Sequence, residues 1–207
     1  MARAASRRSR SSRVGPATGR PAGRPAALRM PPSVRRRARG IRLLVMDVDG
    51  VLTDGTIVCG PDGQEWKTFH VQDGFAITAG QRAGLRMALI SGRTSGAVAR
   101  RAAELGLAEV HQGTRDKVAA YGQLVRRHGL TDAAAAFIGD DLVDLPLLRR
   151  VGLAVAVADA APEVRAAAHY VTAASGGRGA VREVVRLILE AQGRWAEVLH
   201  RFDGTRE

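Results

Sequence analysis

The sequence of 207 residues predicts an α/β fold, in which a parallel sheet carries helices on both of its faces. Short apolar runs of strand type occupy residues 41–48, 85–90, 135–138 and 153–157, and segments with helical periodicity separate them. Gly106 and Gly129 each follow such a segment, where glycine commonly ends a helix. Strands that alternate with helices favour a parallel, Rossmann-like sheet. A hydrophobic content of 45% is sufficient for its core.

The other elements follow in a regular order. Residues 56–71 predict a small β-hairpin insertion whose turn is the Gly-Pro-Asp-Gly sequence at residues 60–63. Asp73 can cap a helix that runs to about residue 82. The remaining segments predict helices at about residues 95–105, 115–128, 142–150, 162–168 and 180–192, and short strands at residues 110–111 and 170–172.

The basic residues are unevenly distributed along the chain. The formal net charge is +12, but residues 1–40 contain twelve arginines and no acidic residue, so residues 41–207 are neutral. Residues 1–40 are rich in Ser, Gly and Pro and predict a disordered, Arg-rich tail. Three interpretations of this tail stay open: an unstructured extension with Met30 as the true start, an organelle transit peptide, or a basic arm that binds RNA or a membrane.

The sequence therefore divides into a tail at residues 1–40, one folded domain at residues 41–193, and a C-terminal tail at residues 194–207. Cys59 is the single cysteine, which excludes an internal disulfide and favours a reducing, cytoplasmic location. The chain contains no apolar run of about 18 residues, so we expect no membrane partner.

Charged and hydroxyl side chains gather where the predicted strands end. Asp47 and Asp49 follow the first strand, Ser91 follows the second, and Lys117 begins a helix. Asp140, Asp141 and Asp144 follow the strand at residues 135–138. Ligands of open α/β sheets bind at this edge. Carboxylates that converge there suit Mg²⁺, and a lysine and a hydroxyl beside the cation suit a phosphoryl group.

These motifs resemble those of the haloacid dehalogenase superfamily, namely DVDGVLTDG, LISGR, the lysine of TRDKV, and GDDLVD. The resemblance implies that Asp47 is the nucleophile that forms an aspartyl-phosphate and that Asp49 is the general acid and base. It further implies that Ser91 binds the phosphoryl group and that Lys117 holds the nucleophile and the phosphate together. The implied Mg²⁺ ligands are Asp47, the Asp49 carbonyl and Asp140, with Asp144 supporting the metal site.

Two other acids lie near these motifs. Asp54 lies beside Gly55 and is expected to shape the turn into the hairpin rather than to act chemically. Asp141 either supports the metal site or caps the helix that follows it.

The spacing of the motifs leaves no room for the cap domain that most members of this superfamily carry. Asp47 and Ser91 are 44 residues apart, and Ser91 and Lys117 are 26 apart.

The segment GQEWKTFHVQDG at residues 63–74, with VGLAVAVADA and GGRGAVREV, is similar to the 3-deoxy-D-manno-octulosonate 8-phosphate phosphatases. This resemblance implies a capless homotetramer in lipopolysaccharide biosynthesis, in which the hairpins of four subunits form a barrel and each neighbour covers the next active site.

The same resemblance implies a substrate site for a small sugar-acid phosphate. Its residues would be His70, Val71, Gln72, Asp73, Gly74, Thr78, Gly92, Arg93, Arg101 and Lys117. The chain departs from the family at three of these positions, since the family usually has Asn in place of His70 and Arg in place of Gln72 and Thr78.

Three alternatives remain at this point. Phosphatases for nine-carbon sugar-acid 9-phosphates of the sialic-acid type carry a similar FHVxDGF segment. A module of the same fold could have lost turnover and serve a nucleotide-sugar pathway. A nucleic-acid phosphatase guided by the basic tail is disfavoured because residues 41–207 are neutral.

Overall fold

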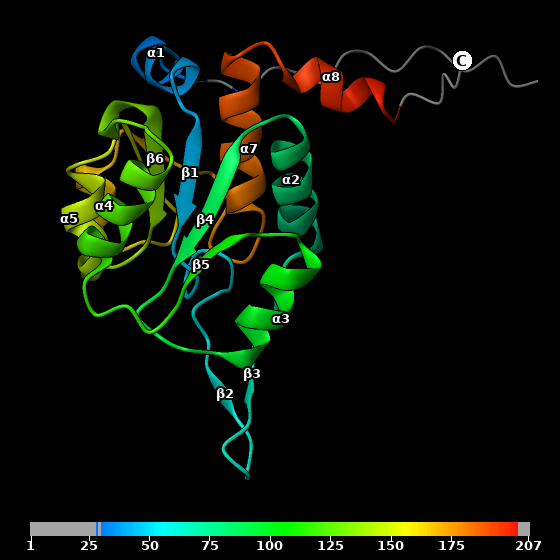
Figure 1. Cartoon of the computed structure of the whole chain (residues 1–207), viewed down its shortest axis with the longest axis vertical. Coiled ribbons are helices and arrows are strands. Elements are labelled where there is room, and N and C mark those ends of the chain that lie inside the picture. The colour runs from blue at the N-terminus through cyan, green and yellow to red at the C-terminus, as the bar shows by residue number, and fades with distance from the viewer. Residues whose placement is uncertain (1–27, 29, 203–207) are drawn as a thin grey trace, which may run out of the picture.

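The central sheet has six strands, all parallel, in the order β5-β4-β1-β6-β7-β8 (Figure 1). The structure is a computed structural model in which residue 28 and residues 30–202 are described. The strands are β1 Leu43–Met46, β4 Arg86–Ile90, β5 Glu109–His111, β6 Ala135–Gly139, β7 Leu153–Ala156 and β8 Tyr170–Val171. The first strand of the sequence is thus central, and the predicted Rossmann-like sheet is confirmed.

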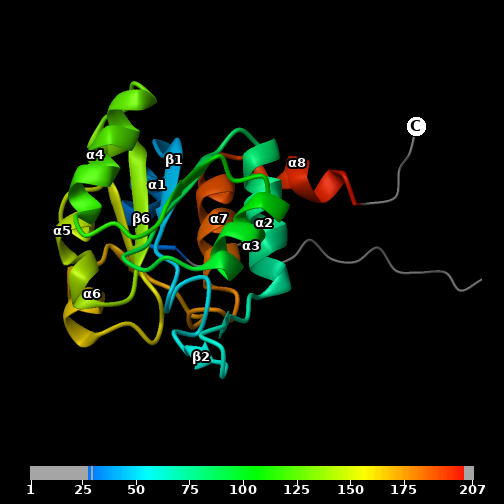
Figure 2. The same cartoon turned by 60° about the horizontal axis from the view of Figure 1, so that its bottom comes forward.

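Helices cover both faces of this sheet (Figures 1 and 2). The helices on one side are α2 Val71–Arg82, α3 Gly96–Glu104 and α7 Ala180–Ala191. Those on the other side are α4 Lys117–Arg127, α5 Leu145–Leu148 and α6 Pro162–Ala167. Two short 3₁₀ turns, Asp132–Ala134 and Leu142–Asp144, precede β6 and α5. The single predicted helix at residues 142–150 is therefore split, and Pro146 lies in the first turn of its α-helical part, where proline is tolerated.

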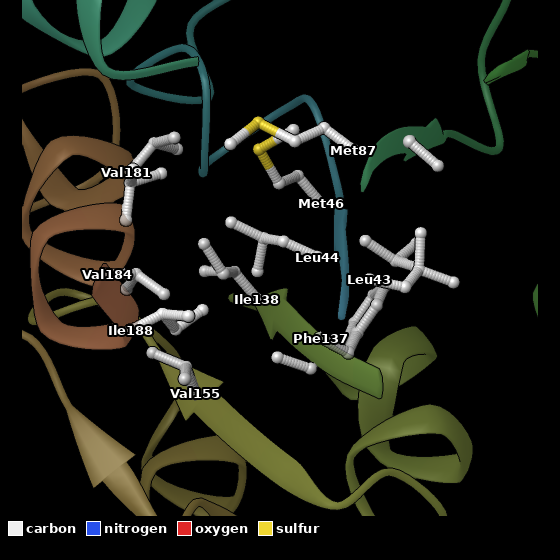
Figure 3. Close-up of a cluster of buried hydrophobic side chains, with 14 of the residues drawn as sticks. Leu43, Leu44, Met46, Met87, Phe137, Ile138, Val155, Val181, Val184 and Ile188 are labelled. Atoms are coloured by element: carbon white, nitrogen blue, oxygen red, sulfur yellow. The ribbon is translucent and has the colours of Figure 1, made fainter. Parts of the chain in front are cut away.

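The core follows from the alternation of side chains along the strands. Leu44 and Met46 of β1 point to the same side as Met87 and Ile138, toward the apolar face of α7, whereas Leu43 and Phe137 point to the opposite side (Figure 3). All six side chains are buried. Because β1 is buried on both faces, it presents an unbroken apolar run rather than an alternating one, as expected of a central parallel strand.

The predicted hairpin consists of β2 Val58–Cys59 and β3 Glu65–Trp66, paired antiparallel. It projects from the carboxyl end of the sheet, at the bottom of Figure 1. No domain is inserted between β1 and β4 beyond this hairpin and α2. The fold is therefore capless, as the spacing of the motifs predicts.

The predicted boundaries of the folded part are wrong at both ends. Residues 32–39, placed in the disordered tail, form helix α1 (Pro32–Arg39), which buries Val34 and Ala38 and packs against α7. Only two apolar residues of this arginine-rich helix face the core, so the periodicity was too weak to recognise. After residue 193, α8 (Trp195–His200) buries Trp195 and Val198. Residues 1–27, 29 and 203–207 lie outside the described part, so the predicted disorder is not tested there.

The predicted capping role of Asp73 is also wrong. Helix α2 begins at Val71 with His70 at its N-cap position. The Asp73 carboxylate, which is buried, instead accepts hydrogen bonds from the backbone N–H groups of Gly179 (3.1 Å) and Arg182 (2.7 Å). Asp73 therefore caps α7, a helix more than a hundred residues away in the sequence.

Among the described residues, no helix is both long and apolar enough to cross a membrane.

Candidate active site

Three neighbouring strands deliver side chains to one cleft at the carboxyl end of the sheet. Asp47 follows β1, Ser91 follows β4, and Asp140 follows β6. Lys117, the first residue of α4, reaches the same place. The cleft has a volume of about 780 Å³, and Asp49, Gly92 and Arg93 also line it. The shared carboxyl edge of parallel strands is what brings residues from 47 to 140 together.

Lys117 is the electrostatic centre of this cleft. Its Nζ lies 3.0 Å from Oδ2 of Asp47 and donates a hydrogen bond of 2.8 Å to Oδ1 of Asp144. The other carboxylate oxygen of Asp144 accepts the backbone N–H of Asp140 at 3.1 Å. Asp144 is fully buried, so it fixes both Lys117 and the start of the loop that carries Asp140.

The acids of the cleft form a group suited to a metal ion. Oxygen atoms of Asp47, Asp140 and Asp144 lie within 4.8 Å of one another. Oδ1 of Asp140 is buried and has no hydrogen-bond partner within the described residues. A buried carboxylate oxygen without a partner is costly, and a cation would remove this cost. Carboxylate oxygens are the ligands that Mg²⁺ prefers, so the donor set fits Mg²⁺.

The pKa values of the acids in the metal-free site also favour the binding of Mg²⁺. Burial, together with the Asp144 carboxylate, raises the pKa of Asp47 to about 6, although Lys117 opposes the shift. Burial and the charges of Asp47 and Asp144 raise the pKa of Asp140 to about 7. One lysine therefore does not compensate three carboxylates, and the site retains an affinity for a second positive charge.

Asp49 lies in a second network, which connects β1 to the hairpin. Lys67, whose side chain is fully buried, donates a hydrogen bond to Oδ1 of Asp49, and its Nζ lies 3.3 Å from Glu65. Arg93 approaches Oδ2 of Asp49 at 3.8 Å and donates a 2.8 Å hydrogen bond to Glu65. These contacts hold the Asp49 carboxylate at the mouth of the cleft, while its neighbour Asp47 points inward.

The loop after β1 is shaped by two small residues. Gly50 has φ +85°, and a Cβ there would overlap the Asp140 carboxylate. Only glycine allows the backbone to pass so close to this acid. The buried Thr53 hydroxyl accepts the N–H groups of Gly50 (3.4 Å) and Gly55 (3.2 Å), which closes the loop.

The remaining predicted residues near the cleft have local roles. Ser91 is buried, lines the cleft, and its Oγ accepts the N–H of Arg93 at 3.2 Å. Asp54 accepts the N–H of Thr56 at 3.1 Å, which confirms its predicted place in a turn. Asp141 accepts the N–H of Leu142 at 2.7 Å at the start of a 3₁₀ turn, which favours the capping interpretation.

Most of the predicted substrate-binding residues do not line this cleft. They are His70, Val71, Gln72, Asp73, Gly74 and Thr78 near or on α2, and Arg101 on α3. Asp73 is engaged with α7, and Arg101 forms an ion pair with Glu104 at 3.1 Å. Val71, in contrast, is 79% exposed. Of the predicted substrate set, only Gly92, Arg93 and Lys117 line the cleft.

The structure also brings in residues that sequence reasoning missed. Lys67 contacts Asp49, and Thr114 and Arg115 line the cleft beside Lys117. The composition of the chain contains a feature that could have indicated the role of Lys67. Of 32 lysines and arginines in the chain, only Lys67 and Lys117 are lysines, and each contacts a carboxylate that follows β1. A compact ammonium fits such buried positions better than the guanidinium used everywhere else in the chain.

Asp47 is paired with a buried lysine and lies beside a group of acids suited to a metal ion. These are the groups that a hydrolase needs to transfer a phosphoryl group to an aspartate. Comparison with known proteins agrees with this class. Residues 101–184 match the model of the haloacid dehalogenase-like hydrolases. The 3-deoxy-D-manno-octulosonate 8-phosphate phosphatase of Salmonella typhimurium is 45% identical over 166 residues, which cover 80% of this chain and 88% of that protein.

Solved structures give the same result. The crystal structure of the corresponding phosphatase from Yersinia pestis is 46% identical, with a TM-score of 0.79, over 80% of this chain and 89% of that one. The enzyme from Moraxella catarrhalis, in complex with a magnesium ion, a phosphate ion and a KDO molecule, is 41% identical, with a TM-score of 0.80, over 82% and 98% of the two chains. The chain belongs to the haloacid dehalogenase-like hydrolases, in the family of 3-deoxy-D-manno-octulosonate 8-phosphate phosphatases.

Proposed function

We propose that the protein is a Mg²⁺-dependent phosphatase that hydrolyses 3-deoxy-D-manno-octulosonate 8-phosphate through an aspartyl-phosphate intermediate. The observation that carries the proposal is the position of Asp47, buried at the end of β1, with Lys117 at 3.0 Å and the acids Asp140 and Asp144 beside it. The relatives named above carry this activity in their names, and the phosphatase for nine-carbon sugar acids is not favoured by them.

In the first half of the reaction, an oxygen of Asp47 attacks phosphorus and the bond from phosphorus to the sugar oxygen breaks. Asp49 donates a proton to the departing oxygen, so the sugar acid leaves as an alcohol. Lys67 and Arg93 hold the Asp49 carboxyl group toward the cleft. Lys117 keeps the attacking oxygen ionised and compensates charge on the transferring group.

In the second half, Asp49 removes a proton from a water molecule, and the oxygen of this water attacks phosphorus. The bond to Asp47 then breaks, inorganic phosphate leaves, and both carboxyl groups return to their starting state. Separate carboxylates are needed because one must form the covalent bond while the other transfers the proton.

Asp47, Asp140 and the Asp49 carbonyl would hold Mg²⁺, with Asp144 behind them. When bound, Mg²⁺ supplies positive charge that neutralises the phosphate oxygens. Ser91 and Lys117 would contact the same phosphoryl group from the protein side. Arg93 and Arg115, both on the cleft, are the cations available for the carboxylate of the substrate.

We also infer that the active site is completed by neighbouring subunits of a homotetramer. The hairpin exposes Ile57 (41%), Val58 (46%) and Trp66 (51%) on strands that project from the body (Figure 1). An isolated two-stranded hairpin is only marginally stable in water, so a partner surface is expected to cover it. Four hairpins in a barrel would supply that surface.

The tetramer would also explain the substrate residues that lie outside the cleft. His70, Gln72 and Thr78 follow the hairpin on α2, so in an assembly through the hairpins they would approach the cleft of a neighbour. The cations that the family usually has at Gln72 and Thr78 are absent here. Arg115, which has no ion pair within residues 30–202, would then supply charge from the cleft's own subunit.

The test is phosphate release from octulosonate 8-phosphate with Mg²⁺, compared with a nine-carbon sugar-acid 9-phosphate and with an aryl phosphate. We expect octulosonate 8-phosphate to have the highest kcat/KM, and we expect both EDTA and the Asp47→Asn substitution to abolish release. Turnover that is unchanged in Asp47→Asn would contradict the mechanism. The absence of Mg²⁺-dependent release from every substrate would identify a non-catalytic module instead.

The oligomer has its own test. Light scattering of the full chain should give a tetramer mass, and Val58→Asp should reduce that mass and the activity together. The matched control is Ala166→Asp, an exposed change on α6, which lies outside both the hairpin and the catalytic cleft. A monomeric wild type with full activity would refute this inference.

The cytoplasmic location and the role in lipopolysaccharide biosynthesis remain predictions, with which the free Cys59 is compatible.

A further inference from the structure

A second cleft lies at the amino end of the sheet, opposite the catalytic cleft, and four arginines line it. Arg39 ends α1, Arg42 precedes β1, Arg86 begins β4, and Arg194 follows α7. The cleft has a volume of about 310 Å³. These arginines come from three segments, at residues 39–42, 86 and 194, and the fold brings these segments together.

The four guanidinium groups are free to bind a ligand. Within residues 30–202, none of them forms a hydrogen bond or an ion pair, and no carboxylate lines the cleft. Glu109 lines an adjacent cleft that shares Arg86, but Arg127 donates a 2.9 Å hydrogen bond to it. The arginine cleft therefore concentrates positive charge without a protein counter-ion.

Helix dipoles account for only part of this arrangement. The cleft lies where α1, α2 and α7 end, and the carboxyl end of a helix attracts cations. Each helix end carries about half a negative charge, so the three ends offset roughly 1.5 of the four positive charges. An excess of positive charge remains, and the like charges repel one another unless an anion is bound.

The backbone around the cleft is held in place. Gln192 donates hydrogen bonds to the carbonyls of Ala38 (3.3 Å) and Ile41 (2.7 Å), which fixes the end of α7 against the start of β1. The N–H of Arg86 donates to the carbonyl of Arg42 at 3.0 Å, which fixes the start of β4 beside the start of β1. A bound anion would therefore meet a preorganised backbone rather than a loose surface.

We propose that this arginine cleft binds a small, multiply charged phosphate, such as a diphosphate or triphosphate group. Guanidinium forks match phosphate oxygens in bidentate fashion, and the cleft volume is within the range of small-ligand pockets. A nucleic acid is less well matched, because no aromatic side chain lines the cleft for base stacking.

The site is separate from catalysis. Arg42 and Asp47 lie at opposite ends of β1, five residues apart, which corresponds to about 16 Å of extended chain. A ligand in the arginine cleft would thus not contact the reacting atoms, and its binding can be measured independently of phosphatase activity.

The experiment is calorimetric titration of the full chain with pyrophosphate and with tripolyphosphate, in EDTA so that the catalytic site lacks its cation. We expect a Kd on the order of 10–100 µM at about 50 mM salt, weakening as salt increases. The double substitution Arg42→Gln/Arg86→Gln should weaken binding at least tenfold while phosphatase activity is retained. Residues 1–29 carry eight further arginines in every variant, so the difference between variants is the decisive quantity.

The matched control is Arg126→Gln/Arg149→Gln, which removes two exposed arginines that lie outside this cleft. If this control weakens binding as much as the cleft variant does, binding reflects net charge and the proposal fails. Equal affinity of wild type and cleft variant would also overturn it, and so would a larger loss of affinity for a single-stranded oligonucleotide than for tripolyphosphate in the cleft variant. The single variant Arg86→Gln repeats the test if the double variant does not fold.

Discussion

Replacement of Lys117 by methionine tests the electrostatic account of the active site most directly. Methionine keeps the aliphatic volume of the lysine stem but removes the ammonium group, which lies 3.0 Å from Asp47 and 2.8 Å from Asp144. Three carboxylates within 4.8 Å of one another would then share a largely buried site without a cation. Breaking a buried ion pair by removing one partner typically costs about 3–5 kcal/mol.

For a domain of this size, that loss corresponds to a decrease in Tm of about 6–20 °C in EDTA. Mg²⁺ should restore part of the stability, because it supplies positive charge to the same acids. Turnover should fall by at least about 10³-fold, since the charge that compensates the transferring phosphoryl group is lost.

The measurements are thermal unfolding with EDTA and with Mg²⁺, and steady-state phosphate release. Arg149→Met is the matched control, because Arg149 is exposed and has no ion pair among the described residues. A loss of stability below about 1 kcal/mol in EDTA would refute the reasoning, since it would mean that Lys117 does not compensate the buried acids.

Further predictions concern Lys67, Gly50, Asp73 and the pH dependence of Mg²⁺ binding. Lys67→Met should lower kcat about 10- to 100-fold in a phosphate-release assay, because Asp49 loses the group that orients it; an unchanged kcat would remove Lys67 from the mechanism. Gly50→Ala should weaken Mg²⁺ binding in calorimetry, because the new Cβ displaces the Asp140 carboxylate; wild-type affinity would contradict this. Asp73→Ala should cost about 1–3 kcal/mol of stability in urea unfolding, because two N–H groups of α7 lose their acceptor; Asp73→Asn, which keeps one acceptor oxygen, should cost less. Since the pKa of Asp140 is raised to about 7 and that of Asp47 to about 6 without metal, protons compete with Mg²⁺, and its Kd should rise about 10- to 20-fold from pH 8 to pH 6.

The same pKa shifts set the sign of the pH dependence of stability. Both carboxyl groups have a higher pKa in the folded protein than the ordinary aspartate value of 3.8, so the folded state binds more protons between about pH 4 and 7. The metal-free protein should therefore become more stable as the pH falls from 8 toward 5, as measured by thermal unfolding in EDTA. The opposite trend would show that other groups dominate the titration.

Much of the site was predictable because it is local in the sequence. Asp47, Ser91 and Asp140 each follow an apolar strand directly, Asp49 lies two residues after Asp47, and the carboxyl ends of parallel strands meet at one edge. Strand periodicity and residue type therefore indicated both the chemistry and the place where it gathers. The hairpin follows from its turn sequence at residues 60–63, and the missing cap follows from the spacing of the motifs together with their resemblance to the superfamily.

Other features could not be predicted, because they depend on long side chains that reach between elements distant in the sequence. Asp73 was assigned to its own helix, since an acid near a helix start usually caps that helix, but its carboxylate reaches the start of α7. Helix α1 was missed because two apolar positions, Val34 and Ala38, decide its packing among many arginines.

The sequence by itself thus determined the α/β class, the strand-end acids and the phosphoryl-transfer chemistry, because these depend on periodicity and on residues next to strands. Only the tertiary structure decided that Lys67 contacts Asp49, that Arg115 lines the catalytic cleft, and that Arg42 and Arg86 line one cleft at the opposite end of the sheet. Those contacts depend on strand order and on side-chain direction, which are properties of the packed chain rather than of any one segment.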